Sequence, residues 1–154
     1  MSTQKQSKVD PSKISILKIN ILKSNIDSPL DYIPDHESGI GFTMSLGNEI
    51  KYDTENKMVR IRLFLSFEET INEEEKTGLK ANFGIEFHFY VGNLDENLVV
   101  EDKDTKINKV LIATLMGMAY SSSRGIILER TSNTYFKGLI IPSIDPYQAL
   151  EDAL

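Results

Sequence analysis

Strict alternation of apolar and polar residues is the feature that most constrains how this chain can fold. Every second residue is apolar from Leu79 to Val91, and the same pattern occurs from Val59 to Phe67 and from Ile40 to Leu46. Successive side chains of a β-strand point to opposite faces of its sheet, so each run predicts a strand with one apolar face.

A fourth strand is expected earlier in the chain, from Lys13 to Ile26. Its alternation slips by one position at Ile16 and Leu17, as a β-bulge would make it. The stretch 28–38 contains two prolines and is expected to be an irregular connection. Connections of about ten residues suit antiparallel neighbours, because a parallel crossover needs a dozen or more residues. The prediction is therefore a four-stranded antiparallel sheet.

The apolar period changes to that of a helix after the last of these strands. Apolar residues recur at helical spacing over 107–119, so a long helix is expected to begin near Thr105. Gly117 and the serines at 121–123 lower the helix propensity and predict a bend in this helix.

A short last helix is predicted over 146–154. Asp145 is a favourable N-cap residue, the proline after it suits the first helical position, and Gln148 is placed to complete a capping box. A helix this short is unstable alone, so Tyr147 and Leu150 should pack against the rest of the fold.

The order of the elements defines the fold class. Strands first and helices last predict an α+β protein, with a four-stranded antiparallel sheet followed by a long bent helix and a short C-terminal helix. We expect a single domain over 13–154, preceded by a disordered polar tail over 1–12.

Composition argues against several classes of function. The 17 basic and 23 acidic side chains give a net charge of -6, the wrong sign for holding nucleic acid over a broad face. The chain has no cysteine, which excludes disulfides and thiolate metal sites and suits a reducing compartment. A polar N-terminus and no apolar run near the roughly 20 residues of a membrane span predict a cytoplasmic protein without membrane insertion.

No pattern in the sequence predicts catalysis or metal binding. The two histidines, His36 and His88, lie on different expected elements, and nothing brings them together as ligands or as part of a triad. The serines at 121–123 match neither a nucleophile elbow nor a phosphate-binding loop. We expect a protein that is not an enzyme and has no cofactor and no metal; an enzyme or small-ligand carrier is the least favoured alternative.

Acidic residues are concentrated between Glu68 and Asp104. This segment has eleven acidic and three basic residues, so its net charge of -8 exceeds that of the whole chain. An acidic surface of this kind steers a basic protein partner. The candidate partner-docking residues are Glu68, Glu69, Glu73, Glu74 and Glu75.

Methionines and aromatic residues are expected near the boundary between the sheet and the long helix. They are Met44, Met58, Met116, Met118, Phe42, Phe64, Tyr90 and Tyr120. Core packing explains most of them, but flexible Met side chains also suit a surface that accepts many apolar chains. The predicted apolar faces exceed what two helices cover, which favours an oligomer interface or a client-binding groove.

The C-terminal half combines several features in a recognisable order. Arg124 in the long helix is followed by Thr134, by an extended apolar stretch that ends at Pro142, and by a last short helix that contains Leu150. In this order, after four strands, the chain resembles SecB-type export chaperones. The resemblance implies a dimer of dimers, a homotetramer with its helices sandwiched between sheets, and neither cofactor nor catalysis.

The resemblance also implies a function as a holdase. Members of the family bind unfolded or precursor proteins in apolar grooves, keep them competent for export, and pass them to the motor ATPase SecA. The candidate client-binding residues are Phe42, Met44, Met116, Met118 and Tyr120.

Two alternatives stay open for the partner. The predicted outer sheet face carries Arg60, Arg62 and Lys80 beside Glu86, unlike the acidic surface that docks SecA in the family. The chain could instead be a dedicated adaptor or assembly module that binds one folded partner through its acidic segment. Some relatives of SecB serve antitoxins, so a chaperone dedicated to an antitoxin is a further alternative.

Overall fold

The computed structural model describes residues 9–34 and 39–152, and it confirms the α+β fold. The elements are η1 (Pro11–Lys13), β1 (Ile14–Asp27), β2 (Ile40–Asp53), β3 (Met58–Ile71), β4 (Glu75–Val91), η2 (Leu94–Asn97), β5 (Leu98–Glu101), β6 (Asp104–Ile107), α1 (Lys109–Thr131) and α2 (Pro146–Asp152). Residues 1–8 of the expected tail lie outside the described part of the chain, whereas Asp10 caps η1 by accepting a hydrogen bond from the Ser12 amide.

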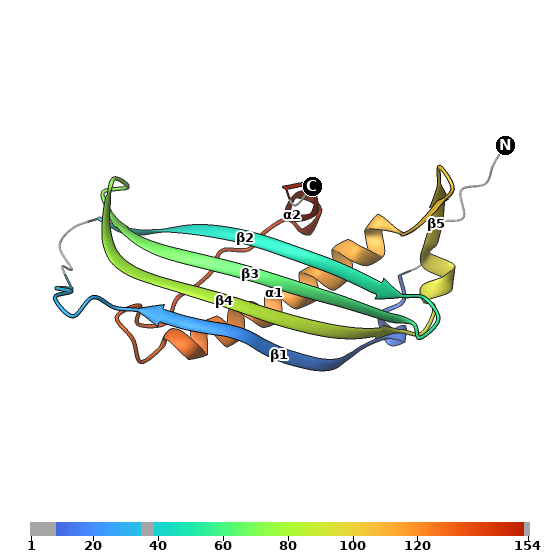
Figure 1. Cartoon of the computed structure of the whole chain (residues 1–154), viewed down its shortest axis with the longest axis horizontal. Helices are drawn as coiled ribbons and strands as arrows, with labels where there is room; N and C mark the ends of the chain where they lie inside the picture. The colour runs from blue at the N-terminus through green and yellow to red at the C-terminus, as the bar shows by residue number, and fades with distance from the viewer. Residues whose placement is uncertain (1–8, 35–38, 153–154) are drawn as a thin grey trace.

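The four long strands form one antiparallel sheet in the order β1-β4-β3-β2 (Figure 1). Its strands are those predicted, and β1 and β2 are the edges. The register between β1 and β4 shifts between Ile16 and Lys18, which confirms the predicted bulge. A second shift, between Ile21 and Lys23, was not predicted.

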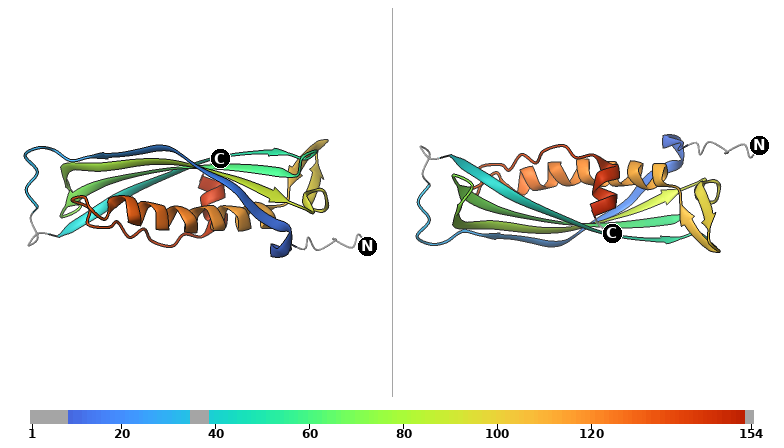
Figure 2. Two further views of the ribbon diagram at one scale, coloured as in Figure 1. Left: turned by 90° about the horizontal axis from the view of Figure 1, so that it is seen from below. Right: turned by 90° about the horizontal axis from the view of Figure 1, so that it is seen from above.

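The core lies between one face of the sheet and α1, which form two layers (Figure 2). Alternate side chains of β3 and β4 are fully buried on this inner face, among them Phe83, Phe87 and Phe89, and they meet Leu115 and Met116 of α1. Burying one such side chain contributes about 1.5–3 kcal/mol, so this layer contact holds the protomer together.

The start of the long helix differs from the prediction. Thr105 lies in β6, which pairs with β5 in a two-stranded sheet that the sequence did not reveal. Asp102 and Lys103 form its turn with φ of 48° and 70°, a left-handed conformation that glycine or asparagine usually signals. The helix begins at Lys109, and the Asn108 side chain caps it by accepting a hydrogen bond of 2.7 Å from the Val110 amide.

The small residues in the middle of α1 do not interrupt it. The helix is continuous through Gly117 and Ser123 to Thr131, and the Ser123 hydroxyl donates to the Ala119 carbonyl at 2.9 Å. A β-carbon built on Gly117 would lie 3.5 Å from Cγ of Pro146, so this small residue lets α2 approach α1 closely. The lower helix propensity of these residues thus does not break α1, and Gly117 lies where α2 packs against it.

α1 also has the length and composition of a membrane-spanning helix. Its most apolar 18-residue window has a mean hydropathy of 1.3, and 44% of that window is buried within the fold. A helix that covers a sheet passes the same test, so the apolarity of α1 is explained by the core that it forms.

Candidate functional site

α1 crosses the inner sheet face diagonally, from the β2 side at its start to the β1 side at its end (Figure 1). The chain then crosses back over β4 and β3 toward β2 before it enters α2 (Figure 1). This return segment, residues 132–145, and α2 leave part of the inner face of β2 exposed. The candidate site is built between these elements.

Two hydroxyl groups hold the return segment against the core. Buried Thr131 donates to the Ile127 carbonyl and accepts the Leu139 amide, each at 2.7 Å. The Tyr120 hydroxyl donates to the Pro142 carbonyl at 2.6 Å. Burial raises the pKa of Tyr120, so this side chain remains a neutral donor.

The β2-α2 groove is a hollow of about 400 Å³ between β2 and the start of α2. Its lining residues are Met44, Leu46, Ser143, Ile144, Asp145, Gln148 and Ala149. The Asp145 carboxylate accepts a hydrogen bond of 2.9 Å from the Tyr147 amide, which confirms its predicted role as N-cap of α2. Leu150 packs against the core as expected, whereas Tyr147 is exposed.

An apolar strip extends the groove along β2. Phe42 is 42% exposed, and its ring centroid lies 5.5 Å from that of buried Phe136 in the return segment. Phe42 and Met44 lie on the same face of β2, and Ile140 of the return segment is 81% exposed. Phe42, Met44 and Leu46 form an apolar strip on this face of β2 that an extended apolar chain could contact.

The structure separates the five predicted client-binding residues. Met44 lines the groove and Phe42 lies beside it. Met116 and Tyr120 are buried in the core and do not line the groove, although Tyr120 bonds to Pro142 of the return segment. Met118 packs partly buried on the core and is not a lining residue.

Sequence reasoning missed several apolar residues of this site. Leu46 continues the alternation of Phe42 and Met44, so the strand pattern could have identified it. Ile140 and Ile144 lie in a segment without regular structure, and only their spacing around Pro142 could have suggested them.

Three of the grouped Met and aromatic residues lie on the other side of the sheet. Register pairs Met58 with Tyr90 on the outer face, and Phe64 with Gly84. The expectation that all of these residues meet the helix is wrong for these three, because their positions in β3 and β4 have the opposite parity to the buried residues.

The predicted acidic segment is divided between two ends of the sheet. Glu73, Glu74 and Glu75 are exposed at the β3-β4 turn, whereas η2 and the β5-β6 turn follow the far end of β4 (Figure 1). The 17 residues of β4 separate the ends by roughly 55 Å. One continuous acidic surface is therefore not formed.

Two of the predicted docking glutamates have partners within the protomer. Glu69 is buried and accepts hydrogen bonds from Tyr32 at 2.5 Å and Thr77 at 3.0 Å. Burial and the bond to Glu69 raise the pKa of Tyr32 to about 12. Glu68 is half-buried and forms an ion pair of 3.5 Å with Lys76.

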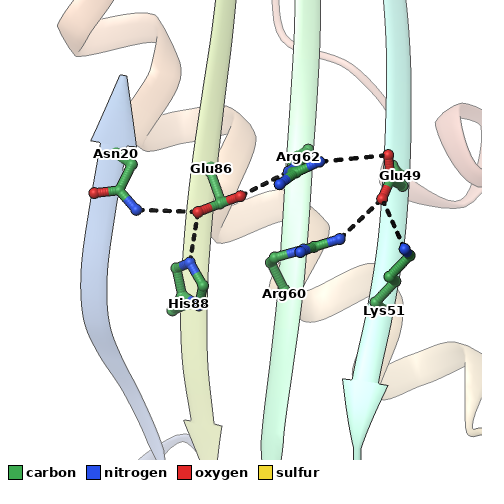
Figure 3. Close-up of polar contacts among 7 residues, drawn as sticks. All are labelled: Asn20, Glu49, Lys51, Arg60, Arg62, Glu86 and His88. Carbon is green, nitrogen blue, oxygen red and sulfur yellow. Dashed lines mark hydrogen bonds and ion pairs between the residues drawn. The ribbon is translucent and has the colours of Figure 1, made fainter. Parts of the chain in front are cut away.

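A polar network crosses the outer sheet face (Figure 3). Glu86 accepts hydrogen bonds from Arg62 at 2.6 Å and Asn20 at 3.0 Å, and it contacts His88 at 2.6 Å. Hydrogen bonds from Asn20, then His88, then Arg62 lower the pKa of Glu86 to about 2. Glu86 is therefore a buried carboxylate held by donors from its own strand and both neighbouring strands.

The second half of this network centres on Glu49 of β2. Arg60 donates to Glu49 at 2.9 Å, and Lys51 and Arg62 lie within 3.7 Å and 3.9 Å of it (Figure 3). Both carboxylates are thus already satisfied by cations, and within the described residues no group of three or more metal-ligating side chains is present. His36 lies outside the described part of the chain.

The edge strand β1 exposes a second apolar surface. Ile16, Ile19 and Ile21 pair with buried residues of β4 and so lie on the inner face, but each stays 38–41% exposed. Leu17 and Leu22 lie at the two register shifts and are also exposed. An unpaired edge strand with this much apolar surface is typical of an assembly interface.

Comparison with solved structures identifies the architecture. The structure matches a SecB-like chaperone of Mycobacterium tuberculosis, Rv1957, solved in complex with a ChAD peptide from the antitoxin HigA1 (Rv1956). The match has a TM-score of 0.60 at 12% sequence identity and covers 86% of this chain and 91% of that one. The chain has the SecB-like fold. The resemblance to SecB-type chaperones that the order of its elements predicted is therefore confirmed for the fold.

Other comparisons add less. A Streptococcus agalactiae protein of unknown function matches with a TM-score of 0.44 and 12% identity, over 84% of this chain and 97% of that one. No family model matches the sequence, and no curated protein matches it.

Proposed function

We propose that this protein is a chaperone that holds extended apolar segments of unfolded proteins along the β2-α2 groove. The observation that carries the proposal is the apolar strip of Phe42, Met44 and Leu46 beside the open groove. The SecB-like fold supports it, because the mycobacterial protein with this fold was solved with a peptide bound.

The proposal requires that the groove binds client segments of many different sequences. Met44 is flexible and polarisable, and Phe42 and Ile140 offer exposed apolar area, so clients of different sequence can be accommodated. We propose that the protein acts without catalysis, in the cytoplasm, and assembles as a homotetramer through its exposed β1 and α1 surfaces. Its clients on this proposal include precursors kept competent for export, and SecA is one candidate receiver.

The binding of unfolded chains can be tested directly. Fluorescence anisotropy of a labelled, permanently unfolded polypeptide should show saturable, salt-resistant binding, and the folded parent of that polypeptide should not bind. Met44→Glu should weaken binding by about tenfold or more, because it places a charge in an apolar contact. Val100→Glu, on the exposed strand β5, is the matched control and should bind like the wild type.

A chaperone dedicated to one partner is the second candidate. The mycobacterial structure holds a peptide from an antitoxin, which is the observation that supports this alternative. It predicts tight binding of one segment and indifference to unrelated unfolded chains. An adaptor that uses the exposed acidic turn Glu73–Glu75 would instead bind a basic partner with strong salt dependence. Equal affinity of Met44→Glu and wild type for unfolded chains would contradict the groove of a general holdase, and equal affinity for the one bound segment would contradict the groove of a dedicated chaperone.

A further inference from the structure

The middle of the outer sheet face is positively charged, although the chain as a whole is acidic. Register aligns three successive rows across the four strands on this face. The rows are Lys18, His88, Arg60 and Lys51; Asn20, Glu86, Arg62 and Glu49; and Lys23, Gly84, Phe64 and Gly47. They contain five cations and two carboxylates, a net charge of +3 in a chain of -6.

The excess positive charge is concentrated on β1. The two carboxylates are occupied by Arg60, Arg62 and Lys51. Lys18 and Lys23 are exposed and form no ion pair with any described residue. Two free cations thus lie at the edge of a network whose three cations and two carboxylates leave a net charge of only +1.

An aromatic side chain lies next to these cations. Phe64 is 43% exposed, and its neighbours across both ladders are glycines, Gly47 and Gly84. The ring of Phe64 and the stem of Lys23 both lie over Gly84, at 3.4 Å and 3.5 Å from where its β-carbon would be. The absence of side chains on both sides leaves the ring accessible beside a cation.

The exposed lysines and the exposed aromatic ring indicate which kind of partner can bind to this face. Exposed Lys side chains attract carboxylates, and a central exposed aromatic residue gives an apolar contact of the kind that dominates interfaces. Nucleic acid fits less well, because Glu49 and Glu86 lie in the middle of the face and the chain as a whole is acidic. α1 and α2 cover only the opposite face (Figure 2).

We propose that the outer sheet face binds an acidic peptide segment of a partner protein, with Phe64 as the apolar contact and Lys18 and Lys23 as the counter-charges. This surface lies on the opposite side of the sheet from the β2-α2 groove. The full chain can therefore hold a client and an acidic partner at the same time.

The test uses a short labelled peptide rich in Asp and Glu with two Phe residues, and the same peptide with Lys in place of each acid. The acidic peptide should bind at least about tenfold more tightly than the basic one, and its affinity should fall as salt screens the exposed charges. The double variant Lys18→Glu with Lys23→Glu should lose at least about tenfold in affinity. Lys103→Glu with Lys106→Glu changes the net charge equally on the β5-β6 hairpin and should bind like wild type.

Further measurements separate this proposal from the others. Phe64→Ser should weaken acidic-peptide binding severalfold, whereas Met44→Glu should leave it unchanged. Circular dichroism of each variant establishes that the fold is retained. Equal binding of both peptides, wild-type binding by the Lys18 and Lys23 variant, or tighter binding of a thymidine oligonucleotide would overturn the proposal. Failure to bind unfolded chains would count against the groove and not against this face.

Discussion

The hydroxyl of Tyr120 donates a hydrogen bond of 2.6 Å to the carbonyl of Pro142, 22 residues further along the chain. This bond joins the middle of α1 to the return segment just before the β2-α2 groove. Tyr120 therefore contributes to the site from below the surface, as a buried residue that positions the residues lining it.

Tyr120→Phe should separate the effect of the hydrogen bond to Pro142 from the effect of the packed ring. The variant keeps the ring but leaves the Pro142 carbonyl without its donor, so the free energy of unfolding should fall by about 1 kcal/mol. Urea unfolding measures the stability, and anisotropy with an unfolded client measures the affinity, which should fall severalfold. Tyr147→Phe, at an exposed position of α2, is the control and should change neither quantity.

Thr131→Val should lower the free energy of unfolding markedly, although it replaces only a hydroxyl group by a methyl group. Valine keeps the shape of the side chain but leaves the buried Leu139 amide without its acceptor, which costs about 1–3 kcal/mol. Thermal or urea unfolding should show this loss. Thr114→Val is the matched control, because the Thr114 hydroxyl bonds only within α1, to the Val110 carbonyl. Equal losses in the two variants would show that the return segment does not depend on Thr131.

Glu86 should make stability depend on acidic pH. Its folded pKa of about 2 lies below the ordinary value of 4.5, so the unfolded chain takes up the proton first. The stabilisation by Glu86 is fully present above pH 4.5 and is lost as the pH falls toward 2. Glu86→Gln removes this titration, so its stability should fall less steeply over the same range. Parallel stability curves for wild type and Glu86→Gln would contradict the network's role.

The sheet could be predicted well, because each strand shows its two-residue period as an alternation of apolar and polar residues. The bulge at Leu17 was visible because it interrupts that alternation. The β5-β6 hairpin was not visible, because its strands are only four residues long and Lys103 follows Asp102 in the turn, where a glycine would have signalled the left-handed conformation.

The candidate site was less predictable than the fold. Phe42 and Met44 could be placed beside the groove from the sequence, because they lie on a strand whose inner face is apolar; client binding by these residues remains a prediction. The burial of Met116 and Tyr120 was not predicted, because spacing within a helix shows which residues share a face but not how deeply the fold buries them. The path of that segment depends on hydroxyl contacts such as that of Thr131, which no local pattern reveals.

Gly117 offers a direct test of how α2 shapes the groove. A β-carbon at this position would meet Pro146 at 3.5 Å, an ordinary contact, so Gly117→Ala should be accommodated. Alanine also favours the helix, and the variant should gain up to about 1 kcal/mol in stability. Gly117→Leu extends further and should displace α2 from α1, altering the groove at Ile144 and Gln148.

The two Gly117 variants should therefore differ in client binding. Gly117→Ala should bind an unfolded client like wild type, and Gly117→Leu should bind it severalfold more weakly while α1 and the sheet remain folded by circular dichroism. The acidic peptide that we assign to the outer face should bind both variants equally, because α2 lies on the other side of the sheet. Unaltered client binding by Gly117→Leu would mean that clients contact β2 alone, away from α2.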